Sequence, residues 1–218
     1  MTVDLASAEE SDGQGARLAA FSVLVQQVRD LMDAAALTDV GEDEMTAVTA
    51  ELVALTDRLR AASRDTPLPA EFTPDGSFRH LGNAVAGACN PHALPLRTEV
   101  TPERGVRAEL TFRPIHEGPP GAVHGGVTAM VLDHLLGTAV AAAGRAGMTG
   151  TLTIRYRRPT PYGRPLEATA EVARVEGRKT WAEGRIATPG GGVLVEATGL
   201  FITPVEWPVP GEGAADAV

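Results

Sequence analysis

The feature that most constrains this sequence is a helix-length segment, residues 124–143, with apolar side chains on nearly every side. Its longest apolar stretch, 127–143, is broken by Asp133, His134 and Gly137. A membrane-spanning helix needs about 20 predominantly apolar residues, so this shorter, interrupted stretch is not predicted to cross a bilayer. A helix without a polar face has to be covered, which predicts a central helix inside a protein core.

Segments with the alternating pattern of β-strands flank this helix. Residues 94–100 and 106–112 precede it and are joined by a turn at 102–105; residues 151–157, 166–175, 179–188 and 193–202 follow it. The economical way to cover one apolar helix with such strands is to wrap an antiparallel sheet around it. The predicted class is therefore α+β, with the hotdog fold.

The first 70 residues have a different pattern, which predicts a helical hairpin. Two apolar stripes recur at spacings of three and four: Leu18, Phe21, Val25, Val28, Met32, and then Met45, Val48, Leu52, Leu55, Leu59. Such a hairpin buries too little to stand alone, so it should pack on the rest of the chain or on a partner subunit. The predicted organisation is an extension at 1–70, a hotdog domain at 71–205 and a flexible tail at 206–218.

Charge and cysteine content narrow the function. The net charge is −9, which argues against nucleic-acid binding, and residues 1–70 carry 13 acidic and 5 basic side chains. Residues 155–185 reverse the balance with 8 basic and 4 acidic side chains, which fits either a small anionic ligand or a solvated strand face. Cys89 is the only cysteine, and no basic flank or apolar signal core opens the chain. A cytoplasmic protein without membrane association is expected.

The central helix carries the candidate chemistry. Asp133 lies about two and a half turns into it, too far to cap the helix, and a carboxylate there is either satisfied by neighbouring polar groups or available as a general base or nucleophile. The turn Gly121–Gly126 leads into the helix. The unpaired N–H groups of a helix start can polarise a carbonyl group, and glycines let that carbonyl approach the backbone closely. Gly126 and Asp133 are seven residues apart and so share one helix face.

Other site types find less support. His124, at the helix start, is expected to cap or orient the turn, and no histidine–acid spacing predicts a metal. Neither a dinucleotide-binding glycine motif nor a Gly-x-Ser-x-Gly elbow is found. A hydratase of the same fold would combine a histidine with an acid, but the adjacent Asp133 and His134 point about 100° apart on a helix.

Four motifs in order resemble those of the PaaI-like hotdog acyl-CoA thioesterases, over about residues 85–203. They are His124–Asp133, with its His-Gly-Gly start, Leu152–Pro161, Val175–Lys179 and Glu196–Phe201. The resemblance implies hydrolysis of acyl-CoA thioesters without a cofactor, in a homodimer or homotetramer whose active sites lie between protomers. It implies that Asp133 is the catalytic carboxylate and that Gly125 and Gly126 form the carbonyl-polarising turn.

The resemblance also implies further site residues. Thr149 matches a hydroxyl that helps to position the attacking water and comes from the same subunit as the acid. Arg157, Arg158, Gly177, Arg178 and Lys179 match positions that gather the phosphates of CoA. The alternatives are a non-catalytic acyl-CoA-binding or regulatory hotdog protein, and an interaction module carried by the N-terminal hairpin. The acyl group and the pathway are left open.

Overall fold

The computed structural model describes residues 5–72 and 78–206, with residues 5–14, Phe72 and Phe78 described by their backbone alone. The chain divides into two compact units, residues 1–95 and 96–218. The flexible tail predicted for 206–218 lies, apart from Glu206, outside the described residues.

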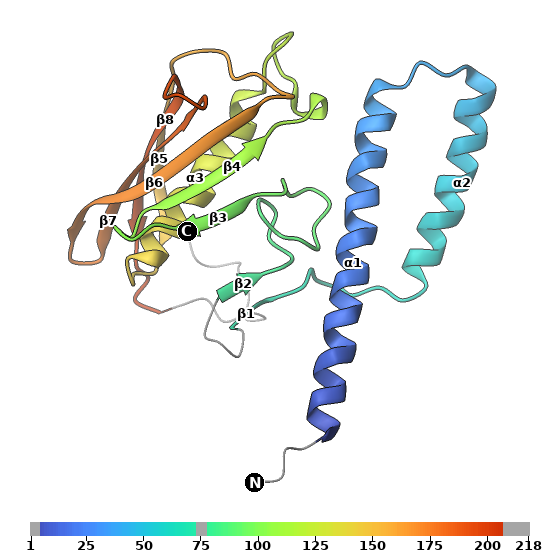
Figure 1. Ribbon diagram of the computed structural model, residues 1–218, viewed down its shortest axis with the longest axis horizontal. Helices are drawn as coiled ribbons and strands as arrows, with labels where there is room; N and C mark the ends of the chain where they lie inside the picture. Colours follow the sequence, from blue (N-terminus) through green and yellow to red (C-terminus); the bar gives the residue numbers. More distant parts are fainter. Residues whose placement is uncertain (1–4, 73–77, 207–218) are drawn as a thin grey trace. The chain divides into compact units, whose positions relative to one another are not determined.

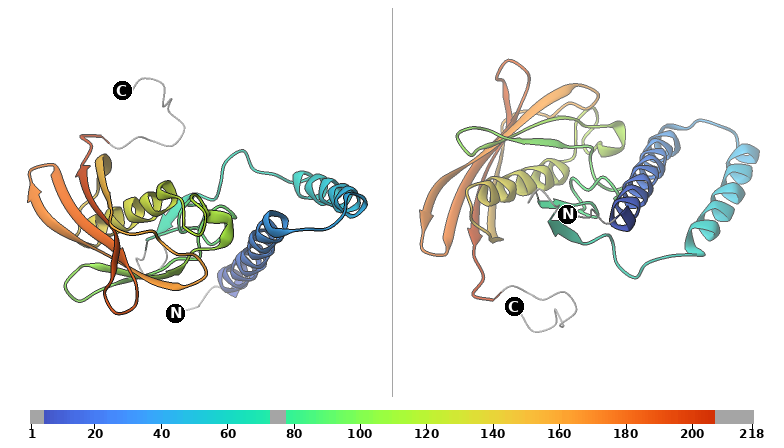
Figure 2. Two further views of the ribbon diagram at one scale, coloured as in Figure 1. Left: turned by 90° about the horizontal axis from the view of Figure 1, so that it is seen from above. Right: turned by 60° about the horizontal axis from the view of Figure 1, so that its bottom comes forward.

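The C-terminal unit is a six-stranded antiparallel sheet with one long helix along one face (Figures 1 and 2). The strands follow the order β3-β4-β6-β7-β8-β5, with β3 and β5 at the edges. Their bounds are β3 Arg97–Val100, β4 Val106–Thr111, β5 Met148–Tyr156, β6 Pro165–Glu176, β7 Lys179–Ala187 and β8 Val193–Ile202. A 3₁₀ turn, Pro114–His116, and helix α3, Gly125–Ala142, connect β4 to β5.

This arrangement confirms the predicted hotdog fold, and most predicted elements lie within a few residues of their observed bounds. The first strand is the exception, because β3 begins at Arg97 and not at Leu94. Pro95 has no N–H to give to a strand ladder, and the Leu94 N–H donates instead to the Val85 carbonyl at 3.1 Å.

Helix α3 can approach the sheet closely because the strands beneath it carry small residues. The strand face beneath α3 includes Ala168, Ala170, Ala182, Gly184, Ala197 and Gly199, of which all but the half-buried Gly184 are buried. Leu136, fully buried on α3, fits between the two glycines: a Cβ atom added to Gly184 or Gly199 would lie 3.2 Å from one of its methyl groups. Close packing thus fixes the position of α3 on the sheet.

In a single chain, only the side of α3 that faces the sheet is buried. Seven of its residues are buried: Thr128, Val131, Leu132, Leu135, Leu136, Ala139 and Val140. The opposite side, with Val127, Met130 and Asp133, stays half-buried, although the sequence predicted a helix covered all round. By length and apolar content alone α3 passes as a membrane span, but its burial under the sheet is that of a core helix.

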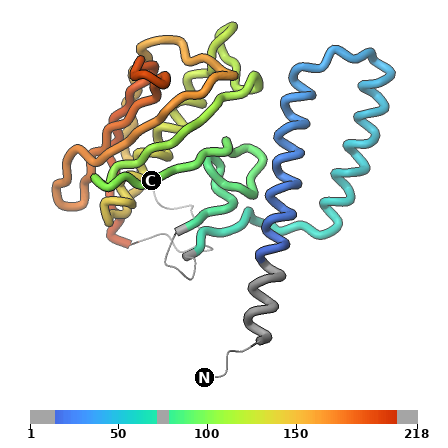
Figure 3. Tube along the Cα trace, in the orientation of Figure 1, coloured from blue at the N-terminus to red at the C-terminus, as the bar shows by residue number. Residues whose placement is uncertain are grey.

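The N-terminal unit contains the two predicted helices, which run antiparallel (Figure 3). Helix α1 spans Leu5–Leu37 and α2 spans Glu42–Arg60. Helix α1 buries Val25 and Arg29, and the Arg29 guanidinium donates to the carbonyl oxygens of Gly87 (3.1 Å) and Asn90 (2.7 Å). Two short strands, β1 Ala70–Phe72 and β2 Phe78–His80, were missed by the sequence analysis because three residues show no measurable alternation.

Candidate active site

Asp133 lies on the half-buried side of α3, next to the side that packs on the sheet. Its carboxylate has one polar partner within the described residues: the Thr149 hydroxyl donates to Asp133 Oδ1 at 2.8 Å. The second carboxylate oxygen is left for a water molecule or a substrate. The two residues that the family resemblance paired are therefore in contact within one protomer.

A bulge in β5 turns Thr149 toward α3. The pairing of β5 with β8 shifts between Thr149 and Thr151, leaving Gly150 as an extra residue. Thr149 pairs with Phe201, which is buried beneath α3, whereas Thr151 pairs with Leu200 on the other face of the sheet. Without the bulge Thr149 and Thr151 would point to the same face, so Gly150 determines which threonine meets Asp133.

The start of α3 has one bonded and one free amide. His124 is the N-cap, and its ring Nδ1 accepts from the Gly126 N–H at 3.0 Å. This bond requires an unprotonated Nδ1, so a neutral His124 carries its proton on Nε2. The Gly125 N–H has no hydrogen-bond partner among the described residues. The geometry therefore favours Gly125 over Gly126 as the donor available to a carbonyl oxygen.

Tyr156, the last residue of β5, contacts the start of α3. Its hydroxyl donates to the Gly125 carbonyl oxygen at 3.1 Å, and a Cβ atom on Gly125 would lie 3.0 Å from the Tyr156 ring. A side chain at position 125 would therefore press against the ring. Tyr156 was not predicted as a site residue, because a contact across 31 residues leaves no local signal in the sequence.

Hydrogen bonds connect the loop before α3 to the segment between β5 and β6. The Val123 N–H donates to the Thr160 carbonyl at 2.8 Å, and the Tyr162 hydroxyl donates to the Glu117 carboxylate at 2.5 Å. That hydrogen bond, together with the negative charge of Glu117, raises the pKa of Tyr162 above its ordinary value. Tyr162 therefore keeps its proton, and its role as a donor, well past neutral pH.

The free amide and the carboxylate are too far apart to act together within one chain. Gly125 and Asp133 are eight residues apart, about 12 Å along a helix with a rise of 1.5 Å per residue. A general base must come within about 3 Å of the proton that it removes, or act through one water molecule. Within one chain, Asp133 therefore cannot act on a carbonyl group that is bound at the Gly125 N–H.

The basic residues matched to CoA binding form two groups within the chain. Arg157 and Arg158 follow β5, and both backbone N–H groups donate to the Leu194 carbonyl near the start of β8. Gly177, with a φ of 56°, and Arg178 form the turn before Lys179, which pairs with Ile202 at the end of β8. The two groups are thus separated by most of strand β8, about 26 Å for the eight residues from Leu194 to Ile202 at 3.3 Å per residue.

The side chains of the two groups differ in their partners. The Arg157 guanidinium forms an ion pair with Glu196 at 2.7 Å. The Gly177 turn is held by Arg145, near the end of α3, whose guanidinium donates to the Gly177 carbonyl at 2.5 Å and to the Thr180 hydroxyl at 3.1 Å. Arg145 was not selected from the sequence either.

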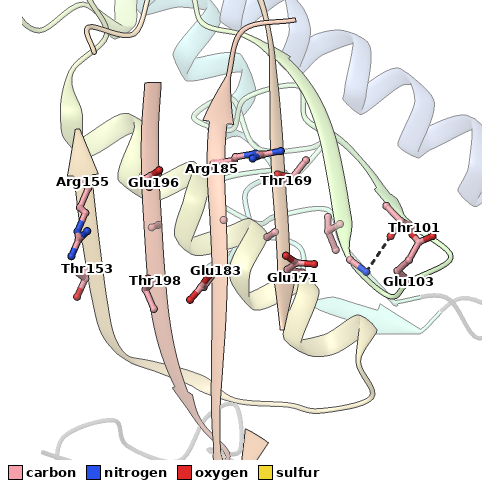
Figure 4. Close-up of a pocket in the computed structure, with 15 residues that line it drawn as sticks. Thr101, Glu103, Thr153, Arg155, Thr169, Glu171, Glu183, Arg185, Glu196 and Thr198 are labelled. Atoms are coloured by element: carbon pink, nitrogen blue, oxygen red, sulfur yellow. Dashed lines mark hydrogen bonds between the residues drawn. The ribbon is translucent and has the colours of Figure 1, made fainter. Parts of the chain in front are cut away.

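A hollow of about 940 Å³ lies on the face of the sheet that points away from α3 (Figure 4). Arg155, Glu196 and Arg185 cross its floor on neighbouring strands, with Glu171 and Glu183 beside them. These charges alternate with the buried residues beneath α3, so the hollow is the solvated side of the sheet. Neither Asp133 nor the start of α3 lines it.

The candidate site can bind a carbonyl oxygen at a helix N-terminus and present a carboxylate to a water molecule or an acyl carbon. Those are the requirements of acyl transfer. No group of three or more metal-ligating side chains is found among the described residues, so these residues define no metal site.

Known proteins that are similar to this chain include thioesterases. A sequence profile of the thioesterase superfamily matches residues 120–195. Acyl-coenzyme A thioesterase THEM4 of Xenopus laevis is 37% identical over 90 residues, which are 41% of this chain and 40% of that protein. THEM4 of Bos taurus is 36% identical over 90 residues, 41% of this chain and 37% of that protein. This chain therefore aligns with about two fifths of the length of these curated relatives.

A solved structure described as a thioesterase superfamily protein extends the match. It is 37% identical, with a TM-score of 0.75, and the alignment covers 84% of this chain and 94% of that one. Residues 96–218 are only 123 of the 218 residues, so an alignment of this extent includes much of the N-terminal unit. The chain therefore belongs to the thioesterase superfamily of hotdog-fold proteins, whose acyl-CoA thioesterases its sequence motifs resemble.

Proposed function

We propose that the protein hydrolyses acyl-CoA thioesters to free carboxylic acids and CoA. One observation carries this proposal: helix α3 offers an unbonded Gly125 N–H at its start and, two turns further on, a carboxylate held by the Thr149 hydroxyl. The THEM4 relatives, which are named acyl-coenzyme A thioesterases, support the substrate class.

The proposed active unit is a homodimer with two equivalent sites. In each site the Gly125 N–H of one protomer binds the thioester oxygen, and Asp133 of the other protomer acts on the acyl carbon. The 12 Å separation along one helix supports this division, since neither protomer can supply both groups to one carbonyl. The half-buried side of α3 and the exposed edge strand β5 also support it, because both need covering.

Asp133 has two possible roles. As a general base it takes a proton from a water molecule while the water oxygen bonds to the acyl carbon. As a nucleophile its own oxygen bonds to that carbon, and water then hydrolyses the anhydride. In both routes the C–S bond breaks, CoA leaves as the thiolate, and the Gly125 N–H stabilises the negative charge that develops on the carbonyl oxygen.

The first experiment is Asp133→Asn, assayed by thiol release over a panel of acyl-CoA esters. The amide oxygen of asparagine can still accept from Thr149, so the fold should persist. We expect the turnover number to fall about 10²- to 10⁴-fold, as for the loss of a general base, while binding of the ester stays measurable. Glu183→Gln, in the hollow on the other face, is the matched control and should be near normal.

Two outcomes of this experiment would reject the proposal. Near-normal turnover in Asp133→Asn would remove that carboxylate from its role. A parent protein that binds acyl-CoA esters but releases no thiol from any of them would favour the non-catalytic binding protein. Because the panel varies the acyl group at constant CoA, the same assay also reports acyl-chain preference.

We further propose that the Gly177–Lys179 turn and Arg158 contact the phosphates of CoA, each from a different protomer in one site. Arg157 is a weaker candidate because Glu196 already pairs with it. Arg158→Ala and Lys179→Ala should raise the KM for CoA esters severalfold but hardly change the hydrolysis of a truncated thioester without phosphates. Arg97→Ala, on edge strand β3, serves as the control. Equal effects on both substrates would exclude phosphate contact.

A further inference from the structure

Helix α2 has an apolar stripe that the described residues of its own unit leave uncovered. Exposed fractions are 46% for Met45, 36% for Val48, 47% for Leu55 and 54% for Leu59, and no residue of α2 is buried. Leu52, at the middle of the stripe, is half-buried. Most of the stability of a helix in a protein comes from packing of its apolar face, so the exposed stripe on this 19-residue helix indicates a missing partner.

Helix α1 of the same unit does not supply this cover. The sequence stripe of α1 is the side that contains the buried Val25, and Arg29 beside it is bonded to the loop at residues 87–90. Val23, Leu24 and Leu31, on other sides of α1, stay exposed at 64%, 39% and 38%. The hairpin thus presents apolar side chains of both helices to its surroundings.

The charges at the two ends of α2 favour a second, antiparallel copy of the same helix as the partner. Its first turn carries Glu42, Asp43 and Glu44, and its last turn carries Arg58 and Arg60. A second α2 helix lying antiparallel brings each acidic end beside a basic end, whereas a parallel copy would bring like charges together. The stripe is also symmetric on reversal, because Met45 and Leu59 are each seven residues from Leu52.

We propose that α2 is a self-association surface, on which the α2 helices of two copies of this chain pack antiparallel about a two-fold axis close to Leu52. Met45 then lies against the partner's Leu59, and Val48 against the partner's Leu55. This interface is separate from the proposed active site, because no residue of α2 belongs to that site. It assigns to the N-terminal unit the task of joining protomers.

Single-cysteine cross-linking in the full-length chain tests the proposal. The only native cysteine, the buried Cys89, is first replaced by alanine. Leu52→Cys, Met45→Cys, Leu59→Cys and Ala50→Cys are then made separately, oxidised, and examined for covalent dimers by gel electrophoresis. A disulfide needs Cα atoms within about 7 Å, and Ala50, about 160° around the helix from Leu52, is the control on the opposite face.

The antiparallel interface predicts a specific pattern. Leu52→Cys should cross-link efficiently and Ala50→Cys should not. Met45→Cys and Leu59→Cys should not cross-link alone, because each lies about 20 Å from its own copy, but a mixture of the two should cross-link. Circular dichroism and thiol release of each variant should match those of the Cys89→Ala parent, which keeps this test separate from the enzymatic proposal.

Other patterns would overturn the proposal. Cross-linking of Met45→Cys or Leu59→Cys alone would mean a parallel pair. Equal cross-linking at Ala50 and Leu52 would mean random collision. A Leu52→Cys chain that does not cross-link would mean that a second α2 helix does not cover the stripe. Slow labelling of that thiol by maleimide would then indicate that its own chain or a different partner covers the stripe. Rapid labelling would indicate that the stripe is exposed to solvent.

Discussion

Asp133 and Thr149 form a charge-assisted hydrogen bond at 2.8 Å, in which the hydroxyl donates to the carboxylate. Because Asp133 has a single polar partner among the described residues, this bond determines how the carboxylate is oriented on α3. Thr149 does not have to touch the substrate for this. We therefore treat it as a positioning residue, whose loss should affect turnover and not substrate binding.

Thr149→Val removes the hydroxyl but keeps the shape of the side chain. A hydrogen bond to a charged group contributes about 1.5–3 kcal/mol, which corresponds to roughly a 10- to 160-fold lower kcat at nearly constant KM. Thr149→Ser retains the hydroxyl and should restore most of the activity. Steady-state kinetics on one acyl-CoA ester measures both constants. A Thr149→Val enzyme with unchanged kcat, or one in which only KM rises, would exclude a positioning role.

The sequence identified part of this residue-scale arrangement. Asp133 stood out because it interrupts an otherwise apolar helix, and Thr149 was chosen only through the family resemblance. Gly150 could not be identified, because one extra residue in a strand looks like any other glycine until the partner strand is aligned. Tyr156 was missed for a similar reason: its hydroxyl bonds to Gly125, whose position relative to Tyr156 depends on the whole fold.

At the scale of elements, the position of α3 depends on the glycines beneath it. A Cβ atom at Gly184 would lie 2.8 Å from the Thr169 carbonyl oxygen and 3.2 Å from Leu136. The first neighbour is backbone and the second is fully buried, so neither can move away. This site therefore reverses the usual rule that replacing glycine with alanine in a regular element is stabilising.

We expect Gly184→Ala to lower the free energy of unfolding by about 1–3 kcal/mol, the usual cost of overpacking a core. Gly15→Ala is the contrasting control. That glycine lies within α1 with no neighbour within 4 Å of an added Cβ atom, so alanine there should be neutral or stabilising. Denaturant unfolding followed by circular dichroism compares the two variants. A Gly184→Ala protein as stable as the parent would disprove the close approach of α3.

The elements themselves were largely predictable, because helix and strand periodicities are local properties of a sequence. Strand β8 begins and ends at the predicted residues, and α3 is one residue shorter than predicted at each end. Burial of the elements was less predictable. The sequence predicted that α3 is covered all round and that the hairpin packs on the rest of the chain or on a partner subunit. In the structure one apolar side of α3 stays half-buried, and the stripe of α2 is largely exposed. A periodic stripe predicts that something covers a helix, and it does not indicate which chain supplies the cover.

At the scale of the whole molecule, the proposed site needs two chains, and a pair of matched substitutions at Gly125 can separate loss of its N–H from the added contact with Tyr156. Proline has no N–H and suits the first residue of a helix, and His124 already has the extended backbone, with a ψ of 134°, that a following proline requires. Gly125→Ala is the matched control: it adds the same contact with Tyr156 but keeps the N–H. Gly125→Pro should therefore lose much more activity than Gly125→Ala.

Mixing two inactive variants then tests whether each site spans two protomers. Asp133→Asn lacks the carboxylate and Gly125→Pro lacks the amide, so neither homodimer has an intact site. Random exchange of equal amounts of the two variants makes half of the dimers mixed. Each mixed dimer contains one intact site and one site with both defects. The mixture as a whole should therefore recover about a quarter of the wild-type activity. Co-expression with two affinity tags isolates the mixed dimer, whose thiol release should be half that of the wild type. If Asp133 and Gly125 of the same chain served one site, every protomer would carry a defect, and the mixed dimer would stay as inactive as its parents.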